Sequence, residues 1–295
     1  MSQSAARSTR FDLGGCIVTL VNGGSLKLDG GAMFGIIPKP LWSRTTPADE
    51  QNRIQLACNC LLVEWPHRGT RRAIIETGRG PKYGEKEQKI FAIDPAVWLL
   101  PSLQAAGVDP ASVTDVAVSH LHFDHAGGRT CERDGRLRPT FPQARVHVQR
   151  QEYEDARANF GVMTATYRRE NLVPIDEARL WNLLEGEAEI VEGIRAIPTP
   201  GHTRGHHSII VQGRDRALIF AGDVIPTAAH AGSPYNMGYD LFPLENRESK
   251  RKVLRWAAER NRLLVIDHEP GTPVVRVAPD GDWFRLEPHA CPAPA

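Results

Sequence analysis

Residues 119–128 read SHLHFDHAGG and place three histidines and one carboxylate within a very short stretch. Imidazole nitrogen and carboxylate oxygen are the ligands that zinc and similar metals prefer. His120 and His122 are two residues apart, so at the end of a strand their side chains lean to the same side. Asp124 and His125 follow on the turn and can point toward a second ion, while the glycines allow a tight fold of the backbone. The stretch therefore predicts a metal site.

Other ligand-type side chains also follow apolar segments that read as strands. A predicted strand, 115–119, leads into the first stretch. The others are His202 after 193–199, Asp223 after 217–220, and His268 after 263–266. If these strand ends converge, they bring together five histidines and two aspartates, which exceed the four or five ligands of one ion. The set suits two ions, with Asp223 as the natural bridging carboxylate.

The spacing His120-x-His122-x-Asp124-His125, followed by Gly201-His202, Gly222-Asp223 and His268, resembles the dinuclear metallo-β-lactamase superfamily. The resemblance implies an α+β fold, an αββα sandwich of two mixed β-sheets flanked by helices. We expect this hydrolase domain to span residues 15–287, after a polar N-terminal segment, 1–14, and before a loose C-terminal tail, 288–295.

The same resemblance implies the ligand sets. One ion would lie on His120, His122 and His202, and the other on Asp124, His125 and His268, with Asp223 and a hydroxide bridging the two. The expected cofactors are two zinc ions, with manganese, cobalt or iron as alternatives. The bridging hydroxide would attack the substrate. Catalytic roles fall to Asp223 and to Asp124, whose second oxygen could pass a proton to the leaving alkoxide.

The substrate class depends on less specific features. Residues 31–42, residues 222–226 and Tyr239-Asp240 are similar to quorum-quenching N-acyl homoserine lactonases and to the methyl parathion hydrolase branch. We therefore expect a lactonase that opens N-acyl homoserine lactones or similar rings. An organophosphate or aryl ester hydrolase is the alternative, and a mononuclear iron oxidoreductase resembling persulfide dioxygenases is the alternative of another class.

Two positions depart from the family pattern. The usual Asp-Thr-Gly reads Glu76-Thr77-Gly78 here, and Glu76 can still accept a hydrogen bond from a ligand histidine. We expect a similar supporting role for His206. Pro226 stands where some lactonases carry a tyrosine, so either the metal stabilises the oxyanion alone or His230, Tyr235 or Tyr239 replaces that tyrosine.

Residues 30–42 are apolar, punctuated by glycine and stiffened by proline, so they form either a loop packed on the core or a pocket wall. The residues that we expect to contact the substrate are Met33, Phe34, Trp42, His230, Tyr235 and Met237. These side chains favour a neutral, partly apolar small molecule.

Apolar alternation predicts further elements. We expect a strand at 15–21 that ends at Asn22-Gly23-Gly24, and a hairpin of strands 57–64 and 72–77. A helix is expected at 245–259, and residues 151–177 are expected to be helical.

Composition limits the class of function. The 295 residues carry 36 basic and 35 acidic side chains, a net charge of +1, which gives no electrostatic footprint for nucleic acid or an anionic membrane. The five scattered cysteines do not form a disulfide framework. No apolar stretch approaches the roughly 18 residues of a membrane span, and residues 1–10 lack the apolar core of a secretory signal. We therefore expect a cytoplasmic protein, and the lactonase resemblance implies a homodimer.

Overall fold

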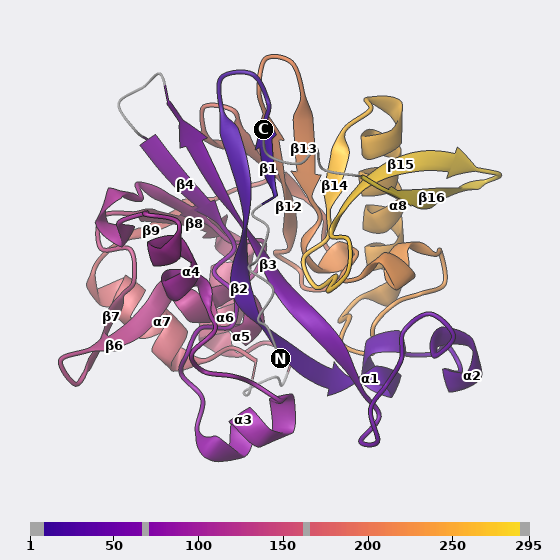
Figure 1. Ribbon diagram of the computed structural model, residues 1–295, viewed down its shortest axis with the longest axis horizontal. Coiled ribbons are helices and arrows are strands. Elements are labelled where there is room, and N and C mark those ends of the chain that lie inside the picture. The colour runs from indigo at the N-terminus through magenta and orange to yellow at the C-terminus, as the bar shows by residue number, and fades with distance from the viewer. Residues whose placement is uncertain (1–8, 67–70, 162–165, 290–295) are drawn as a thin grey trace.

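The computed structural model describes residues 9–66, 71–161 and 166–289. Its main body consists of two seven-stranded sheets that contain both parallel and antiparallel pairs (Figure 1). The first sheet has the strand order β1 (Arg10–Asp12), β2 (Ile17–Asp29), β3 (Arg53–Trp65), β4 (Arg71–Ile75), β5 (Asp115–Ala117), β8 (Arg145–Gln149) and β9 (Trp181–Leu184). The second has the order β10 (Ala188–Val191), β11 (Ile194–Pro198), β12 (His207–Gln212), β13 (Ala217–Phe220), β14 (Leu263–Val265), β15 (Val274–Asp280) and β16 (Trp283–Pro288). A small hairpin is formed by β6 (Thr130–Arg133) and β7 (Arg136–Pro139).

Helices cover the outer faces of both sheets. The first sheet is covered by α4 (Leu99–Ala105), α6 (Arg150–Ala158) and α7 (Arg169–Glu177), and the second by α8 (Pro243–Glu259). The remaining helices are short and lie outside these layers: α1 (Gly30–Phe34), α2 (Lys39–Trp42), α3 (Glu85–Phe91) and α5 (Phe123–Ala126). Single 3-10 turns are found at η1 (Pro110–Ser112), η2 (Gly127–Arg129), η3 (Gly222–Val224) and η4 (Ala228–Ala231).

Apolar side chains form three layers of core, as the alternation of side chains along each strand requires. Between the sheets, Leu61 and Ala117 of the first pack with Ile209 and Phe220 of the second. Separate apolar clusters lie beneath the helices on each outer face. The predicted αββα sandwich of two mixed sheets is therefore confirmed. Within the described ranges, no helix has the length and apolarity needed to cross a bilayer.

Two local predictions were wrong. The strand that we expected to end at Asn22 continues to Asp29, because β2 absorbs the glycine pair in a register shift between Asn22 and Ser25. Residues 30–42 are partly helical instead of a loop. The helix α1 starts there because the Asp29 carboxylate accepts a hydrogen bond from the Ala32 N–H at 2.8 Å.

The ends of the chain bear on the expected domain limits. The strand β1 pairs with β2, so the first sheet begins at Arg10, inside the polar segment that we expected to precede the domain. Most of the expected loose tail, residues 290–295, lies outside the described residues. The domain limits therefore stay a prediction.

Candidate metal centre

Four strand ends deliver ligand-type side chains to one place at the rim of the sandwich. The first sheet supplies the segment after β5, and the second supplies the segments after β11, β13 and β14. All seven predicted ligands are buried: His120, His122, Asp124, His125, His202, Asp223 and His268. The cluster is therefore shared between the two sheets.

Close backbone packing makes this convergence possible, and it requires glycine at two positions. A Cβ atom on Gly128 would lie 2.1 Å from the Thr77 carbonyl oxygen, so the turn after His125 packs directly on the end of β4. Gly222 has a φ of 61°, and a Cβ there would lie 2.6 Å from Nε2 of His206. Glycine adopts this left-handed conformation without strain, which lets Asp223 turn into the cluster.

Three of the histidines form one group, which we call the three-histidine group: His120, His122 and His202. One nitrogen from each lies within 4.8 Å of the others. Nδ1 of His122 and Nε2 of His202 are only 3.0 Å apart. Nε2 of His120 is buried without a hydrogen-bond partner among the described residues. Imidazole lone pairs thus face a common point.

A second group, which we call the mixed group, consists of His125, His268 and Asp124. The Nε2 atoms of His125 and His268 lie 3.2 Å apart. The two carboxylate oxygens of Asp124 lie 3.8 Å from Nε2 of His125 and 3.6 Å from Nε2 of His268. This arrangement brings together the residues that were predicted for the second ion.

Asp223 lies between the two groups. Its Oδ1 is 3.5 Å from Nε2 of His125 and 3.2 Å from Nε2 of His268. Its Oδ2 is 3.3 Å from Nε2 of His202, which belongs to the three-histidine group. One carboxylate therefore faces both groups with different oxygens, which is the geometry that a bridging ligand needs.

Asp267 was missed by the sequence reasoning, although it directly precedes His268 at the end of β14. Its Oδ2 lies 2.9 Å from Nδ1 of His125, the ring nitrogen opposite the one that faces the mixed group. Oε2 of Glu76 lies 3.6 Å from the same nitrogen, and its Oε1 accepts a hydrogen bond from the Ser119 N–H at 2.7 Å. Carboxylates in such positions orient a metal-ligating histidine and make it more basic.

The other rings are oriented in the same manner. Nδ1 of His202 lies 3.0 Å from Oδ1 of Asp240, and Nδ1 of His268 lies 2.7 Å from the Ala57 carbonyl oxygen. His206 does not face the groups. Its Nε2 accepts a hydrogen bond from the Asp223 N–H at 3.0 Å, so it fixes the loop that carries the bridging carboxylate.

The electrostatics of the two groups differ. Burial, and then the nearby His125, keeps the pKa of His120 well below its ordinary value. Burial alone would also lower the pKa of His125, but the carboxylates of Asp223, Asp267 and Asp124 raise it well above that value. Asp223 is buried as well, yet the surrounding histidines hold its pKa well below the usual range. The site thus combines buried imidazole nitrogens with buried negative carboxylates that face the same points. Such a combination suits the binding of two cations.

A small cavity of about 180 Å³ opens above these ligands. Its wall is mostly apolar and comprises Leu28, Met33, Leu56, Phe91, Phe123, Thr166, Met237 and Tyr239. Five of the predicted ligands, His122, Asp124, His202, Asp223 and His268, also line it. Apolar walls with a few polar groups are typical of sites for small organic ligands.

Only two of the six predicted substrate contacts, Met33 and Met237, line this cavity. Phe34, Trp42 and His230 do not line it. The rings of Trp42 and His230 stack on that of Phe34, with centroids 5.0 and 4.6 Å from it, and the role of these three residues as substrate contacts stays a prediction. His230 is also fully engaged: its ring nitrogens lie 2.7 Å from Thr227 Oγ1 and 2.8 Å from the Met33 carbonyl oxygen.

Tyr235 does not line the cavity either, since its ring packs edge-on against Phe34, and its contact with substrate likewise stays a prediction. Of the three residues that could replace the missing tyrosine, only Tyr239 lines the cavity wall.

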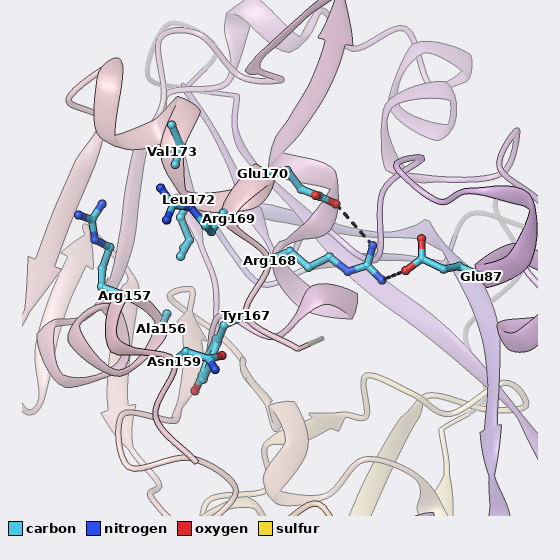
Figure 2. Close-up of a pocket in the computed structure, with 10 residues that line it drawn as sticks. All are labelled: Glu87, Ala156, Arg157, Asn159, Tyr167, Arg168, Arg169, Glu170, Leu172 and Val173. Carbon is cyan, nitrogen blue, oxygen red and sulfur yellow. Dashed lines mark hydrogen bonds and ion pairs between the residues drawn. The ribbon is translucent and has the colours of Figure 1, made fainter. Parts of the chain in front are cut away.

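A larger hollow of about 540 Å³ lies on the far side of Tyr167, between α6 and α7 (Figure 2). Its lining contains none of the predicted ligands. Arg168 there is hydrogen-bonded to Glu87 at 2.6 Å and to Glu170 at 3.5 Å, as Figure 2 shows. Because this cation is already paired and lies away from the ligands, the hollow is not a candidate for the reaction site.

The chain is similar to known proteins of one family. A model of the family described as the metallo-beta-lactamase superfamily matches residues 53–268. The N-acyl homoserine lactonase of Bacillus cereus is 32% identical over 118 residues, which are 40% of this chain and 40% of that protein. The N-acyl homoserine lactonase AttM of Rhizobium radiobacter is 30% identical over 176 residues, 57% of this chain and 62% of that protein. The chain therefore spans less than two thirds of these curated relatives.

Solved structures match over nearly the whole chain. A probable metal-dependent hydrolase from Staphylococcus aureus is 29% identical, with a TM-score of 0.84, and the match covers 95% of this chain and 100% of that one. AidC, a dizinc quorum-quenching lactonase, is 17% identical, with a TM-score of 0.78 and coverage of 96% and 97%. At that identity the second match shows a likeness of fold alone.

Proposed function

The chain belongs to the metallo-beta-lactamase superfamily of hydrolases, and we propose that it opens N-acyl homoserine lactones or similar lactone rings at a dinuclear metal centre. The observation that carries this proposal is the placement of Asp223 between two ligand groups on the floor of an apolar cavity. The relatives named as N-acyl homoserine lactonases support the choice of substrate.

One cation would be held by the three-histidine group and the other by the mixed group, and Asp223 could offer one oxygen to each. Zinc is our expectation, because imidazole and carboxylate are its usual ligands. When bound, such ions lower the pKa of water to about 7 and thus supply hydroxide near neutral pH. No serine or cysteine nucleophile is required, and no histidine of the cluster is left to activate one.

The protein's own residues would complete the reaction. Asp124 belongs to the mixed group and also lines the cavity, so its carboxylate can take up the proton of the attacking water and deliver it to the ring oxygen that leaves. The ester carbon–oxygen bond breaks, and the product is a hydroxy acid. Met33, Met237 and Phe123 exclude water and offer an apolar surface to the acyl chain.

Tyr239 is the best-placed neutral donor. Its hydroxyl makes no hydrogen bond to another residue in the described part of the chain, and its ring lines the cavity. Burial, and then the charges of Asp29 and Asp124, raises the pKa of Tyr239 to about 12. The phenol therefore keeps its proton at neutral pH and can donate to a developing oxyanion.

The test combines metal analysis with a substrate panel. Purified protein is analysed for metal by mass spectrometry and assayed on an N-acyl homoserine lactone, an aryl ester and a phosphotriester. We expect two metal equivalents and lactone turnover well above the other substrates. Asp223→Asn should lose metal and activity together, whereas Asp282→Asn, on the exposed turn before β16, should behave as wild type. Fewer than two equivalents after reconstitution would contradict the dinuclear assignment, and a single iron without hydrolysis would favour the oxidoreductase alternative.

One observation favours a second candidate, an aryl ester or organophosphate hydrolase. The rings of Phe91 and Phe123 lie 5.6 Å apart, and both line the cavity. Such a pair can pack against an aromatic leaving group. Preference for the aryl substrates in the panel would select this function over lactone hydrolysis.

We also propose a homodimer with α1 and α2 at the contact. The lactonase resemblance makes this segment a candidate contact, and two of its apolar side chains are exposed, Ile36 at 86% and Leu41 at 46%. Light scattering should give twice the chain mass, and Ile36→Asp should reduce it to that of the monomer. Leu137→Asp, on the hairpin at the opposite side of the molecule in Figure 1, is the matched control and should leave the mass unchanged.

A further inference from the structure

Glu152 is a carboxylate that lies next to the ligand groups without belonging to either. It lies on α6, is fully buried, and forms no ion pair with a described residue. Burial raises its pKa, as expected for a carboxylate taken out of water. A buried carboxylate is costly unless several donors satisfy it, so its partners indicate what it does.

All three partners of Glu152 are donors beside the three-histidine group. Oε1 accepts hydrogen bonds from the Leu121 N–H at 2.9 Å and from the Tyr167 hydroxyl at 3.1 Å. Oε2 accepts one from the Thr203 hydroxyl at 2.6 Å. Leu121 lies between two ligand histidines of the chain, and Thr203 directly follows the third.

Tyr167 extends the same support, because its ring packs against that of His122 with centroids 5.0 Å apart. The loop that carries His202 lies directly on α6: a Cβ atom on Gly205 would be 2.3 Å from the Glu152 nitrogen. One side chain thus joins the backbone that carries His120 and His122, the loop that carries His202, and the aromatic ring beside the site.

The mixed group is held by other residues. Asp267 and Glu76 face Nδ1 of His125, and the Ala57 carbonyl faces Nδ1 of His268. None of the hydrogen bonds of Glu152 reaches these residues. Glu76 also reaches the three-histidine side through the Ser119 N–H, but the hydrogen bonds of Glu152 are confined to residues beside the three-histidine group.

We propose that Glu152 is a positioning residue that holds the three-histidine group in its binding geometry, so that the two cation sites can be weakened independently. This inference rests on the proposed dinuclear centre. It is tested by titrating the metal-free protein with Co²⁺ alone and following the visible absorption, which reports each site without any assay of activity.

The informative variant is Glu152→Gln, which keeps the shape but replaces one acceptor oxygen with an NH₂ group that faces a donor. Wild type should bind two Co²⁺ ions. The variant should bind Co²⁺ at the mixed group with the affinity of wild type and at the three-histidine group about 10–100-fold more weakly, as is usual when a residue that orients a metal ligand is changed. Its spectrum with one ion bound should match that of His202→Ala, in which the three-histidine group is broken, and differ from that of His268→Ala.

Two controls separate positioning from general damage. Glu154→Gln changes an exposed carboxylate on the same helix and should leave both affinities unchanged. Asp267→Asn should have the opposite effect: it should lower the Co²⁺ affinity of the mixed group and leave that of the three-histidine group unchanged. If Glu152→Gln does not fold, Thr203→Val removes a single donor and should weaken the same site to a smaller degree.

The outcomes distinguish this inference from the proposed function. Wild type that binds fewer than two ions contradicts the dinuclear centre itself. Wild type that binds two, together with a Glu152→Gln variant in which both affinities are unchanged or fall equally, overturns the role of Glu152.

Discussion

His207 offers a sharp test of how the space between the sheets is stabilised. It lies on β12 in alternation with Ile209, which faces the first sheet, and it is fully buried. Neither of its ring nitrogens has a hydrogen-bond partner among the described residues. His147, its neighbour in the first sheet, is by contrast satisfied on both sides, by Asp115 at 2.9 Å and Asn182 at 2.8 Å. We therefore predict that His207→Leu stabilises the protein, whereas His147→Leu destabilises it.

The size of the effect follows from two contributions. An unsatisfied buried polar group costs about 1–3 kcal/mol, which the leucine removes at any pH. Burial, and then the neighbouring His147, lowers the pKa of His207 from 6.5 to about 3 in the folded protein. Between these values the unfolded chain binds the extra proton, so stability falls as the pH falls below 6.5. A pH of 5 lies about 1.5 pH units below 6.5, and each pH unit contributes about 1.4 kcal/mol, so the loss at pH 5 is about 2 kcal/mol.

The assay is urea unfolding followed by circular dichroism at about pH 7.5 and pH 5, with chelator present so that metal release does not differ between the conditions. The advantage of His207→Leu over wild type should grow by about 2 kcal/mol on going to pH 5, since only wild type has this histidine to protonate. The reasoning would be refuted if His207→Leu were less stable than wild type at pH 7.5 and lost as much stability as wild type on going to pH 5. That result would show that the buried ring is satisfied.

Three further predictions concern the site itself. Tyr239→Phe should lower kcat/KM for the lactone about 10–100-fold, because one hydrogen-bond donor to a developing negative charge is lost, while the metal content stays unchanged. Steady-state kinetics equal to those of wild type would exclude the hydroxyl from the reaction. Gly128→Ala should abolish folding or metal binding, because the new Cβ would lie 2.1 Å from the Thr77 carbonyl oxygen, whereas Gly84→Ala has open space and should be neutral in soluble yield and metal content. Metal binding should release protons near neutral pH. Burial alone would lower the pKa of His268, but the neighbouring carboxylates raise it well above its ordinary value, so a cation must displace a proton from this ring. Calorimetry in buffers of different ionisation enthalpy should detect that release.

The ligand groups could be predicted from the sequence because each ligand is encoded locally. An apolar strand followed by a turn fixes where His202, Asp223 or His268 leaves the sheet, and the two-residue spacing of His120 and His122 fixes their common direction. The sandwich itself was predicted from the family resemblance that these ligand motifs carry. These features depend on neighbours in the chain and need no knowledge of distant contacts.

The supports and the pocket wall could not be predicted in the same way, because they depend on distant contacts. His230 bonds to the carbonyl of Met33, which is 197 positions away in the chain, and this contact draws the ring behind the wall. Phe34 and Trp42 are aromatic, as a pocket wall would require, yet they stack on each other. Glu152 looks like any other charged residue of a helix until the fold places three donors around it.

The ligands of the centre come from both sheets, and this has a consequence for the chain as a polymer. His122 and His202 meet although 80 positions separate them, and His125 and His268 meet across 143 positions. Cations held there would act as reversible cross-links that close very long loops, much as disulfides do in secreted proteins. A chain depleted of metal would lose those cross-links at the rim, where the two sheets would be the first to part, and a protease should cut there before it cuts within either sheet.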